Sequence, residues 1–181
     1  VDALANAVRP TLGPVGRNVA LARDPATKAP ELLDDAATIA RRIIQLPDAD
    51  ADMGAMVLRQ AMWKVHEAVG DGTATMAVLF QAIVREGRRL IAGGENAMAL
   101  REGLHWAAGR VAEALRRQAR PLEGAEALAR FALSVARDPE LARVVGEIFD
   151  IVGADGYVQV EESQRPGLER EYVEGRYWKG S

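Results

Sequence analysis

Apolar residues recur every three or four positions over most of this chain, a spacing that places them on one face of an α-helix. The pattern predicts helices over residues 1–9, 36–44, 50–69, 73–92, 96–118, 124–134 and 138–152. Most connections between the longer helices are short, so neighbouring helices are expected to pack antiparallel in a bundle. The chain is therefore predicted to be mainly α.

Two parts of the chain show the pattern of β-strands instead. Residues 19–22 and 31–33 are short apolar stretches joined by a loop, 23–30, that is too long for a tight hairpin turn. Residues 157–160 and 171–173 read as strands around a polar loop. We therefore expect a β stem-loop early in the chain and a short β segment near its C-terminus.

The composition excludes several classes of function. The formal net charge of −3 indicates no basic surface for nucleic acid. No apolar run approaches the ~18 residues that span a bilayer, and no signal peptide is visible. The absence of cysteine excludes disulfides and zinc–thiolate sites. We expect a cytoplasmic protein that binds neither nucleic acid nor membranes. Because residue 1 is a valine within a helical pattern, we also expect a piece of a larger protein.

The candidate chemistry gathers in a glycine-containing loop between two long predicted helices. Gly70 and Gly72 allow a tight turn there, and Thr73 is placed to cap the helix that follows. The free N–H groups of a first helical turn suit phosphate, and Asp71 beside a phosphate requires a cation such as Mg²⁺ between them. On this stretch alone, a plain helix–turn–helix corner with a C′ glycine and a threonine N-cap is the simpler explanation of the same residues.

A second acidic position lies at Asp34 and Asp35, directly before the helix predicted over 36–44. The two carboxylates can act as helix N-caps or can belong to a functional site, and the pattern leaves both readings open. His66 has no second ligand at a helical spacing, so no histidine metal site is predicted.

Several motifs together resemble those of the group I chaperonins of the GroEL type. The first is Thr-Leu-Gly-Pro-x-Gly-Arg-Asn-Val over residues 11–19. The resemblance covers essentially the whole chain, and the ordered set is far more specific than any single motif. The further motifs are Asp35 at the start of a helix, Met53-Gly54-Ala55, Gly70-Asp71-Gly72-Thr73-x-Thr75, Gly153-Ala154-Asp155-Gly156-Tyr157-Val158 and Val173-Glu174-Gly175.

The resemblance implies a domain layout and partners. Residues 1–117 correspond to the first half of the equatorial, ATP-binding domain, and residues 118–174 to the first half of the intermediate, hinge domain. Residues 175–181 correspond to the entry to an apical domain that these 181 residues do not include. The implied partners are identical or related chaperonin subunits in a ring, together with unfolded proteins and a co-chaperonin that bind through the apical domain.

The resemblance also implies a site for ATP or ADP with Mg²⁺. In that site Asp71 holds the metal, and Asp35 serves catalysis by orienting water near the terminal phosphate. Leu133 is expected to pack against the adenine. The other expected contacts to the nucleotide come from two loops and are made by Thr11, Leu12, Gly13, Pro14, Gly72, Thr73, Ala74 and Thr75.

Four positions depart from the family pattern. The family usually has lysine where this chain has Val15 and Asp34, glycine at Ala36, and threonine at Ala74. The loss of a lysine and the gain of Asp34 make the candidate site more negative, which weakens phosphate binding unless cations compensate. Because the lysine and threonine positions help to hold a monovalent cation in the family, potassium (K⁺) activation is in doubt here.

The expected function is that of the ATP-binding portion of a chaperonin that assists protein folding by ATP-driven ring movements. The alternative is a divergent structural or assembly module with little nucleotide binding. Full-length members of the family are ATPases, and their general base lies on a segment that the resemblance places beyond Ser181. The 181 residues alone are therefore expected to be inactive in hydrolysis.

Overall fold

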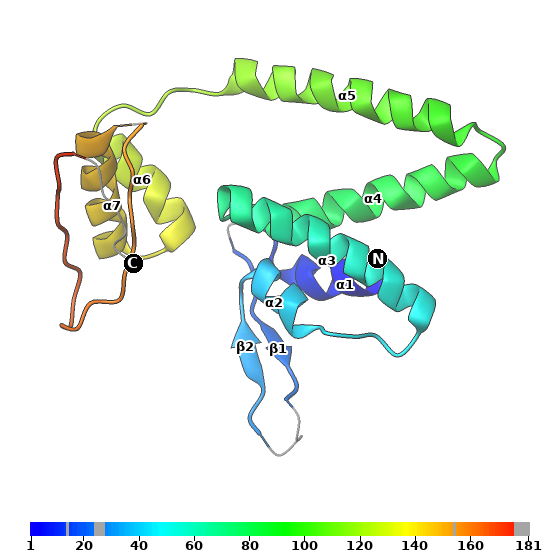
Figure 1. Cartoon of the computed structure of the whole chain (residues 1–181), viewed down its shortest axis with the longest axis horizontal. Helices are drawn as coiled ribbons and strands as arrows, with labels where there is room; N and C mark the ends of the chain where they lie inside the picture. Colours follow the sequence, from blue (N-terminus) through cyan, green and yellow to red (C-terminus); the bar gives the residue numbers. More distant parts are fainter. Residues whose placement is uncertain (14, 24–27, 154, 176–181) are drawn as a thin grey trace. The chain divides into compact units, whose positions relative to one another are not determined.

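A computed structural model describes residues 1–13, 15–23, 28–153 and 155–175 of the chain. The described residues form a mainly helical structure with one two-stranded antiparallel sheet, which confirms the predicted fold class (Figure 1). None of the described helices is long and apolar enough to cross a membrane. The elements are α1 (Asp2–Val8), η1 (Arg9–Thr11), β1 (Val19–Leu21), β2 (Glu31–Leu33), α2 (Ala36–Arg42), α3 (Ala49–Val69), α4 (Thr73–Ala92), α5 (Ala97–Gln118), α6 (Ala125–Ala136) and α7 (Pro139–Val152).

The chain divides into two compact units, one over Val1–Leu115 and one that begins at Arg116. The first unit contains α1 to α4, the hairpin and nearly all of α5, and the second contains α6 and α7. The predicted boundary near residue 117 concerns the functional domains of the family, so it stays a prediction.

The core of the first unit forms where α1, α2, α3 and α4 meet. Its largest fully buried side chains follow helical spacing, four residues apart on α1 and again on α3. Burying each of these side chains stabilises the fold by roughly 1.5–3 kcal/mol. The side chains are Leu4, Val8, Ile39, Leu58 and Met62.

The predicted stem-loop is present as the β1–β2 hairpin, with Val19 opposite Leu33. Figure 1 shows the hairpin extending from the helices of the first unit. Val19 and Leu33 pack against the core, whereas Leu32 is 66% exposed, as the alternation of a strand requires. No third strand pairs with this hairpin among the described residues, and residues 24–27 of its loop lie outside them.

The predicted β segment near the C-terminus is wrong. Residues 157–160 and 171–173 form no strand in the described part of the chain. Tyr157 is 78% exposed and Val160 is 91% exposed, so these two apolar side chains are not buried. Alternation is a local pattern, but a strand also needs a hydrogen-bonded neighbour, and neither stretch has one here.

Helix α5 begins as predicted, because the Asn96 side chain accepts hydrogen bonds from the backbone N–H groups of Met98 and Ala99 at 2.8 and 3.2 Å. Its apolar face, however, was expected to point into a bundle, and the helix buries none of its residues. Val111 is 57% exposed and Leu115 is 61% exposed. An amphipathic pattern identifies the apolar face of a helix but not the segment that covers it.

The second unit is built on a close contact between α6 and α7 at Gly146. A Cβ atom added there would lie 2.6 Å from both the Ala125 carbonyl oxygen and the Ala129 backbone nitrogen. Helix α7 starts within one residue of the predicted position, and Asp138 accepts hydrogen bonds from the N–H groups of Glu140 and Leu141, each at 2.9 Å. The two helices therefore approach at a point where only glycine fits.

The contact at Gly146 predicts that alanine destabilises the protein there, whereas alanine stabilises it at a glycine with free space around it. Gly146→Ala should destabilise the second unit by about 1–3 kcal/mol, because the added methyl group meets backbone atoms. Gly109→Ala is the matched control: Gly109 lies in α5 with nothing near its Cβ position, so alanine should stabilise by roughly 0.5–1 kcal/mol. Denaturant unfolding of both variants measures the difference. A Gly146→Ala protein as stable as the unchanged chain would contradict the contact.

Candidate functional site

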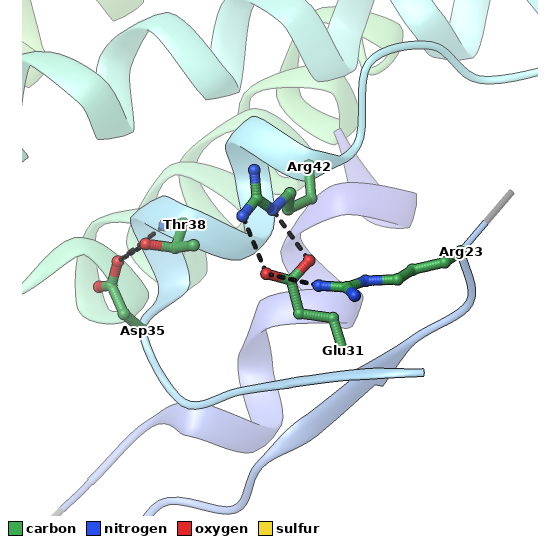
Figure 2. Close-up of polar contacts among 5 residues, drawn as sticks. All are labelled: Arg23, Glu31, Asp35, Thr38 and Arg42. Carbon is green, nitrogen blue, oxygen red and sulfur yellow. Dashed lines mark hydrogen bonds and ion pairs between the residues drawn. The ribbon is translucent and has the colours of Figure 1, made fainter. Parts of the chain in front are cut away.

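Asp35 begins α2 and uses its carboxylate to cap that helix. Oδ2 accepts hydrogen bonds from the Thr38 N–H at 2.7 Å and the Thr38 hydroxyl at 2.6 Å (Figure 2). Oδ1 accepts one from the Ala37 N–H at 3.3 Å. This confirms the N-cap reading of Asp35. An ionised carboxylate offers about four acceptor positions, so the cap leaves Oδ1 able to accept another partner.

The environment of Asp35 keeps its carboxylate charged. Burial raises the pKa of Asp35, but the hydrogen bonds from Thr38 and Ala37 and the nearby His66 lower it by more. The net result is a pKa below the ordinary value of 3.8. Asp35 is therefore an anion over the neutral range, as a group that orients water beside a metal–phosphate complex must be.

The hairpin is attached to α2 close to this site. Glu31 of β2 accepts hydrogen bonds from Arg42 Nε at 3.0 Å and Arg42 Nη2 at 2.8 Å, and Arg23 lies 3.7 Å from the same carboxylate (Figure 2). The hydrogen bond from Arg42 lowers the pKa of Glu31. The pair is solvent-accessible, so its main contribution is to orient α2 against β2.

The glycine loop between α3 and α4 has the tight turn that the sequence predicted. Gly70 ends α3 with φ 77° and Gly72 precedes α4 with φ 78°, a left-handed conformation that favours glycine. Asp71 lies exposed between them, and its Oδ1 accepts a hydrogen bond from the Gly72 N–H at 2.6 Å. The turn thus presents one carboxylate to solvent.

The prediction that Thr73 caps α4 is wrong. The N-cap residue is Gly72, which has no side chain to bond, and Thr73 is the first helical residue, only 5% exposed. Since the left-handed turn ends at Gly72, Thr73 already has helical geometry and its side chain packs inward. The first-turn N–H groups of Thr73, Ala74 and Thr75 therefore have no intrahelical acceptor and no side-chain cap.

An uncapped start of a 20-residue helix can accept an anion, because the N–H groups and the helix dipole both favour negative charge. Asp71 beside it fits a Mg²⁺ ion, which typically takes one or two protein carboxylates and completes its octahedron with phosphate oxygens and water. No group of three or more metal-ligating side chains occurs in the described residues. One carboxylate beside free N–H groups would fit a metal that is held together with a phosphate ligand.

The loop after α1 offers backbone groups rather than side chains. The Thr11 hydroxyl donates to the Val8 carbonyl at 2.8 Å, and Leu12 is 40% exposed. Gly13 has φ 94°, and its carbonyl accepts a hydrogen bond from the Gly16 N–H at 3.1 Å. Pro14, also predicted to contact the nucleotide, lies outside the described residues. The arrangement is compatible with the predicted backbone contacts.

The structure brings most of the candidate residues into one unit. Helix α2 packs on α3 and α4, and η1 packs on α4, so the segments that carry Asp35, Asp71 and Thr11 belong to the same core. Leu133 lies on α6 in the second unit and is 40% exposed. Its contact with adenine stays a prediction.

Sequence reasoning missed Gln81, a polar side chain of α4 that is 2% exposed. It follows buried Thr73 and Ala77 at successive four-residue steps, so it lies on the buried stripe of the helix. A glutamine at that spacing was the available signal. The His66 ring stacks on Trp63 at a centroid distance of 5.0 Å.

The cap at Asp35 predicts an acid-dependent stability. Because the folded-state pKa of Asp35 is lowered, its stabilising contribution is complete above the ordinary value of 3.8 and is lost as pH falls through the lowered pKa. Asp35→Ala should cost about 0.5–2 kcal/mol at pH 7. The difference from the unchanged chain should shrink below pH 4 in denaturant unfolding.

Asp34→Ala is the matched control, since Asp34 is exposed and lies one residue before the cap. It should change the free energy of unfolding by much less than Asp35→Ala at pH 7. Equal losses in the two variants would contradict the capping role.

Comparison with known proteins agrees with the motifs and the fold. The profile of the TCP-1/cpn60 chaperonin family matches residues 4–148, which include the loop after α1, Asp35 and the Gly70–Gly72 turn. Over 175 residues the chain is 42% identical to Chaperonin GroEL 1 of Mycobacterium bovis (strain BCG / Pasteur 1173P2). The alignment covers 97% of this chain and 32% of that protein, so the chain spans about a third of its relative. The chain belongs to the TCP-1/cpn60 chaperonin family and is of the GroEL type.

Proposed function

We propose that this chain is the ATP-binding part of a chaperonin that assists protein folding. The observation that carries the proposal is the start of α4, where three uncapped N–H groups lie next to the exposed carboxylate of Asp71. A phosphate would satisfy the N–H groups, and Mg²⁺ would join that phosphate to Asp71. Family membership supports the same assignment for these residues.

The candidate residues at the starts of α2 and α4 and in the glycine turn each have a definite task in this proposal. Thr73, Ala74 and Thr75 bind phosphate oxygens through their N–H groups, and the exposed Thr75 can also offer its hydroxyl. Asp71 holds Mg²⁺, which neutralises charge on the phosphates. Asp35 is the second anion and orients water towards the metal–nucleotide complex, since its own cap leaves an acceptor position open.

The departures from the family pattern favour weak binding. Val15 is 87% exposed and replaces a positive charge in the first loop, while the exposed Asp34 adds a negative one. Ala74 has no hydroxyl to help hold a monovalent cation, so we propose that K⁺ contributes little. The competing proposal, favoured by these residues, is a structural or assembly module without nucleotide. Calorimetric titration with Mg·ATP separates the two.

The partners follow from the family. We propose that the parent protein acts in the cytoplasm in a ring of identical or related subunits. The unpaired edges of β1 and β2 suit pairing with a strand of a neighbouring subunit. Unfolded proteins and a co-chaperonin would bind through an apical domain, which these 181 residues do not include.

The metal role of Asp71 predicts that Asp71→Asn abolishes Mg²⁺-dependent binding of ATP while the fold persists. Asparagine keeps an oxygen that can accept from the Gly72 N–H, so the turn is preserved, but it removes the charge that Mg²⁺ needs. Calorimetry with and without Mg²⁺ measures binding, and a melting curve checks the fold. Asp71→Ala should also abolish Mg²⁺-dependent binding of ATP, as Asp71→Asn does. It should in addition lower the free energy of unfolding by up to about 2 kcal/mol. Unchanged Mg·ATP affinity in both variants would refute the role.

The same proposal predicts that these 181 residues do not turn over ATP. Asp35 and Asp71 can place metal and water, but in the family the general base lies on a segment beyond Ser181. Loss of a general base typically lowers the rate ~10²–10⁴-fold. Phosphate release should therefore equal that of a protein-free control, and Asp34→Asn should change nothing. Robust Mg²⁺-dependent release that disappears in Asp34→Asn would instead assign the base to Asp34.

A further inference from the structure

Gln81 places a buried amide in the contact between two helices. It is 2% exposed and lies on α4, which packs against α1. A buried amide is costly unless its hydrogen bonds are made, because it loses its bonds to water. The hydrogen-bond partners of Gln81 therefore indicate which segments its burial holds together.

Among the described residues, the hydrogen-bond partners of Gln81 come from α1 and η1. Its Oε1 accepts a hydrogen bond from Arg9 Nη2 at 2.5 Å, and its Nε2 donates to Asp2 Oδ1 at 2.6 Å and Asn6 Oδ1 at 3.2 Å. Asp2, Asn6 and Arg9 are spaced so that they lie on one face of a helix. The hydrogen bond from Gln81 lowers the pKa of Asp2, and Arg85, one turn later on α4, lies 3.5 Å from the same carboxylate.

These bonds determine the register of α1 on α4. The apolar contacts around them, made by Leu4, Val8 and Ala77, are non-directional and specify the alignment less sharply than hydrogen bonds do. Hydrogen bonds from both ends of one amide are directional, and a shift along either helix leaves the buried amide of Gln81 unpaired. Gln81 therefore selects one alignment of the two helices.

Arg9 connects the alignment of the two helices to the candidate site. The Arg9 carbonyl accepts a hydrogen bond from the Leu12 N–H at 3.1 Å, and the adjacent Pro10 carbonyl accepts one from the Arg17 N–H at 2.8 Å. The loop after α1 is thus attached to the residues that Gln81 holds. On the other helix, Gln81 lies eight residues, roughly 12 Å, after Thr73.

We propose that Gln81 is a positioning residue of the candidate nucleotide site: through Arg9 it holds the loop of residues 11–13 in register with the N-terminus of α4. Gln81 does not touch the nucleotide in this account. Its effect on binding rests on the proposed function, whereas its effect on the loop does not. The two effects can therefore be measured separately.

The test replaces Gln81 with methionine, which has similar length but makes no strong hydrogen bonds. The matched control is Gln60→Met, the same change at an exposed position of α3. Hydrogen exchange of the Leu12 and Arg17 amides is measured on the full chain without nucleotide, and affinity for Mg·ADP is measured by calorimetry. We expect about tenfold faster exchange at both amides and about tenfold weaker binding in Gln81→Met only, within the usual range for a shared network.

Arg9→Met provides a second variant that does not disturb the core, because Arg9 is exposed. It removes the loop-side partner of Gln81 and should accelerate exchange at Leu12 and Arg17 as Gln81→Met does. The double variant should be no worse than the worse single variant, since both remove the same bond. Leu58→Val, a core change outside this network, shows what a general loss of stability does to the same amides.

The outcomes separate the two proposals. If the unchanged chain binds no Mg·ADP but the two single variants accelerate loop exchange, the proposed nucleotide function fails and the loop role of Gln81 stands. If the unchanged chain binds and both variants bind equally well, Gln81 does not position the site. Exchange in Arg9→Met that matches the unchanged chain, or that merely matches Leu58→Val, overturns the inference.

Discussion

The structure of the first unit depends on the burial of one apolar core shared by α1, α2, α3 and α4. Every candidate site segment there begins or ends a helix of that core. Asp35 begins α2, Asp71 separates α3 from α4, and Arg9 follows α1. Because each helix is held by its buried face, the core brings these termini together, and hydrogen bonds such as those of Gln81 then align them. The core therefore supplies most of the geometry of the site.

Polar groups at the helix N-termini then determine which termini have free N–H groups that can bind a ligand. Asp48 accepts a hydrogen bond from the Ala51 N–H in α3, and Asp138 accepts from the Glu140 and Leu141 N–H groups in α7, so both helix starts have a side-chain cap. Asp35 caps α2 in the same way and remains charged. Helix α4 starts at Gly72 without a side-chain cap, beside a carboxylate that faces solvent. That contrast makes the start of α4 suited to an anion held with a metal.

The elements that sequence reasoning predicted well depend on interactions within a few residues. Helix α4 spans the predicted residues, and α7 starts at the Asp138–Pro139 signal, because periodicity, caps and proline act locally. The motif around Asp71 likewise located the turn and both of its left-handed glycines. The cap at Thr73 was misassigned because the direction of its side chain depends on the core behind it.

By itself, the sequence determined the helices, the hairpin and the family, since these follow from short-range patterns and ordered motifs. Only the tertiary structure decided that Gln81 is buried against α1, that α5 exposes its apolar face, and that residues 157–160 pair with no strand. Each of these depends on a partner far away in the chain. A local pattern shows which groups need burial or hydrogen bonds, and only the folded chain shows which segment provides them.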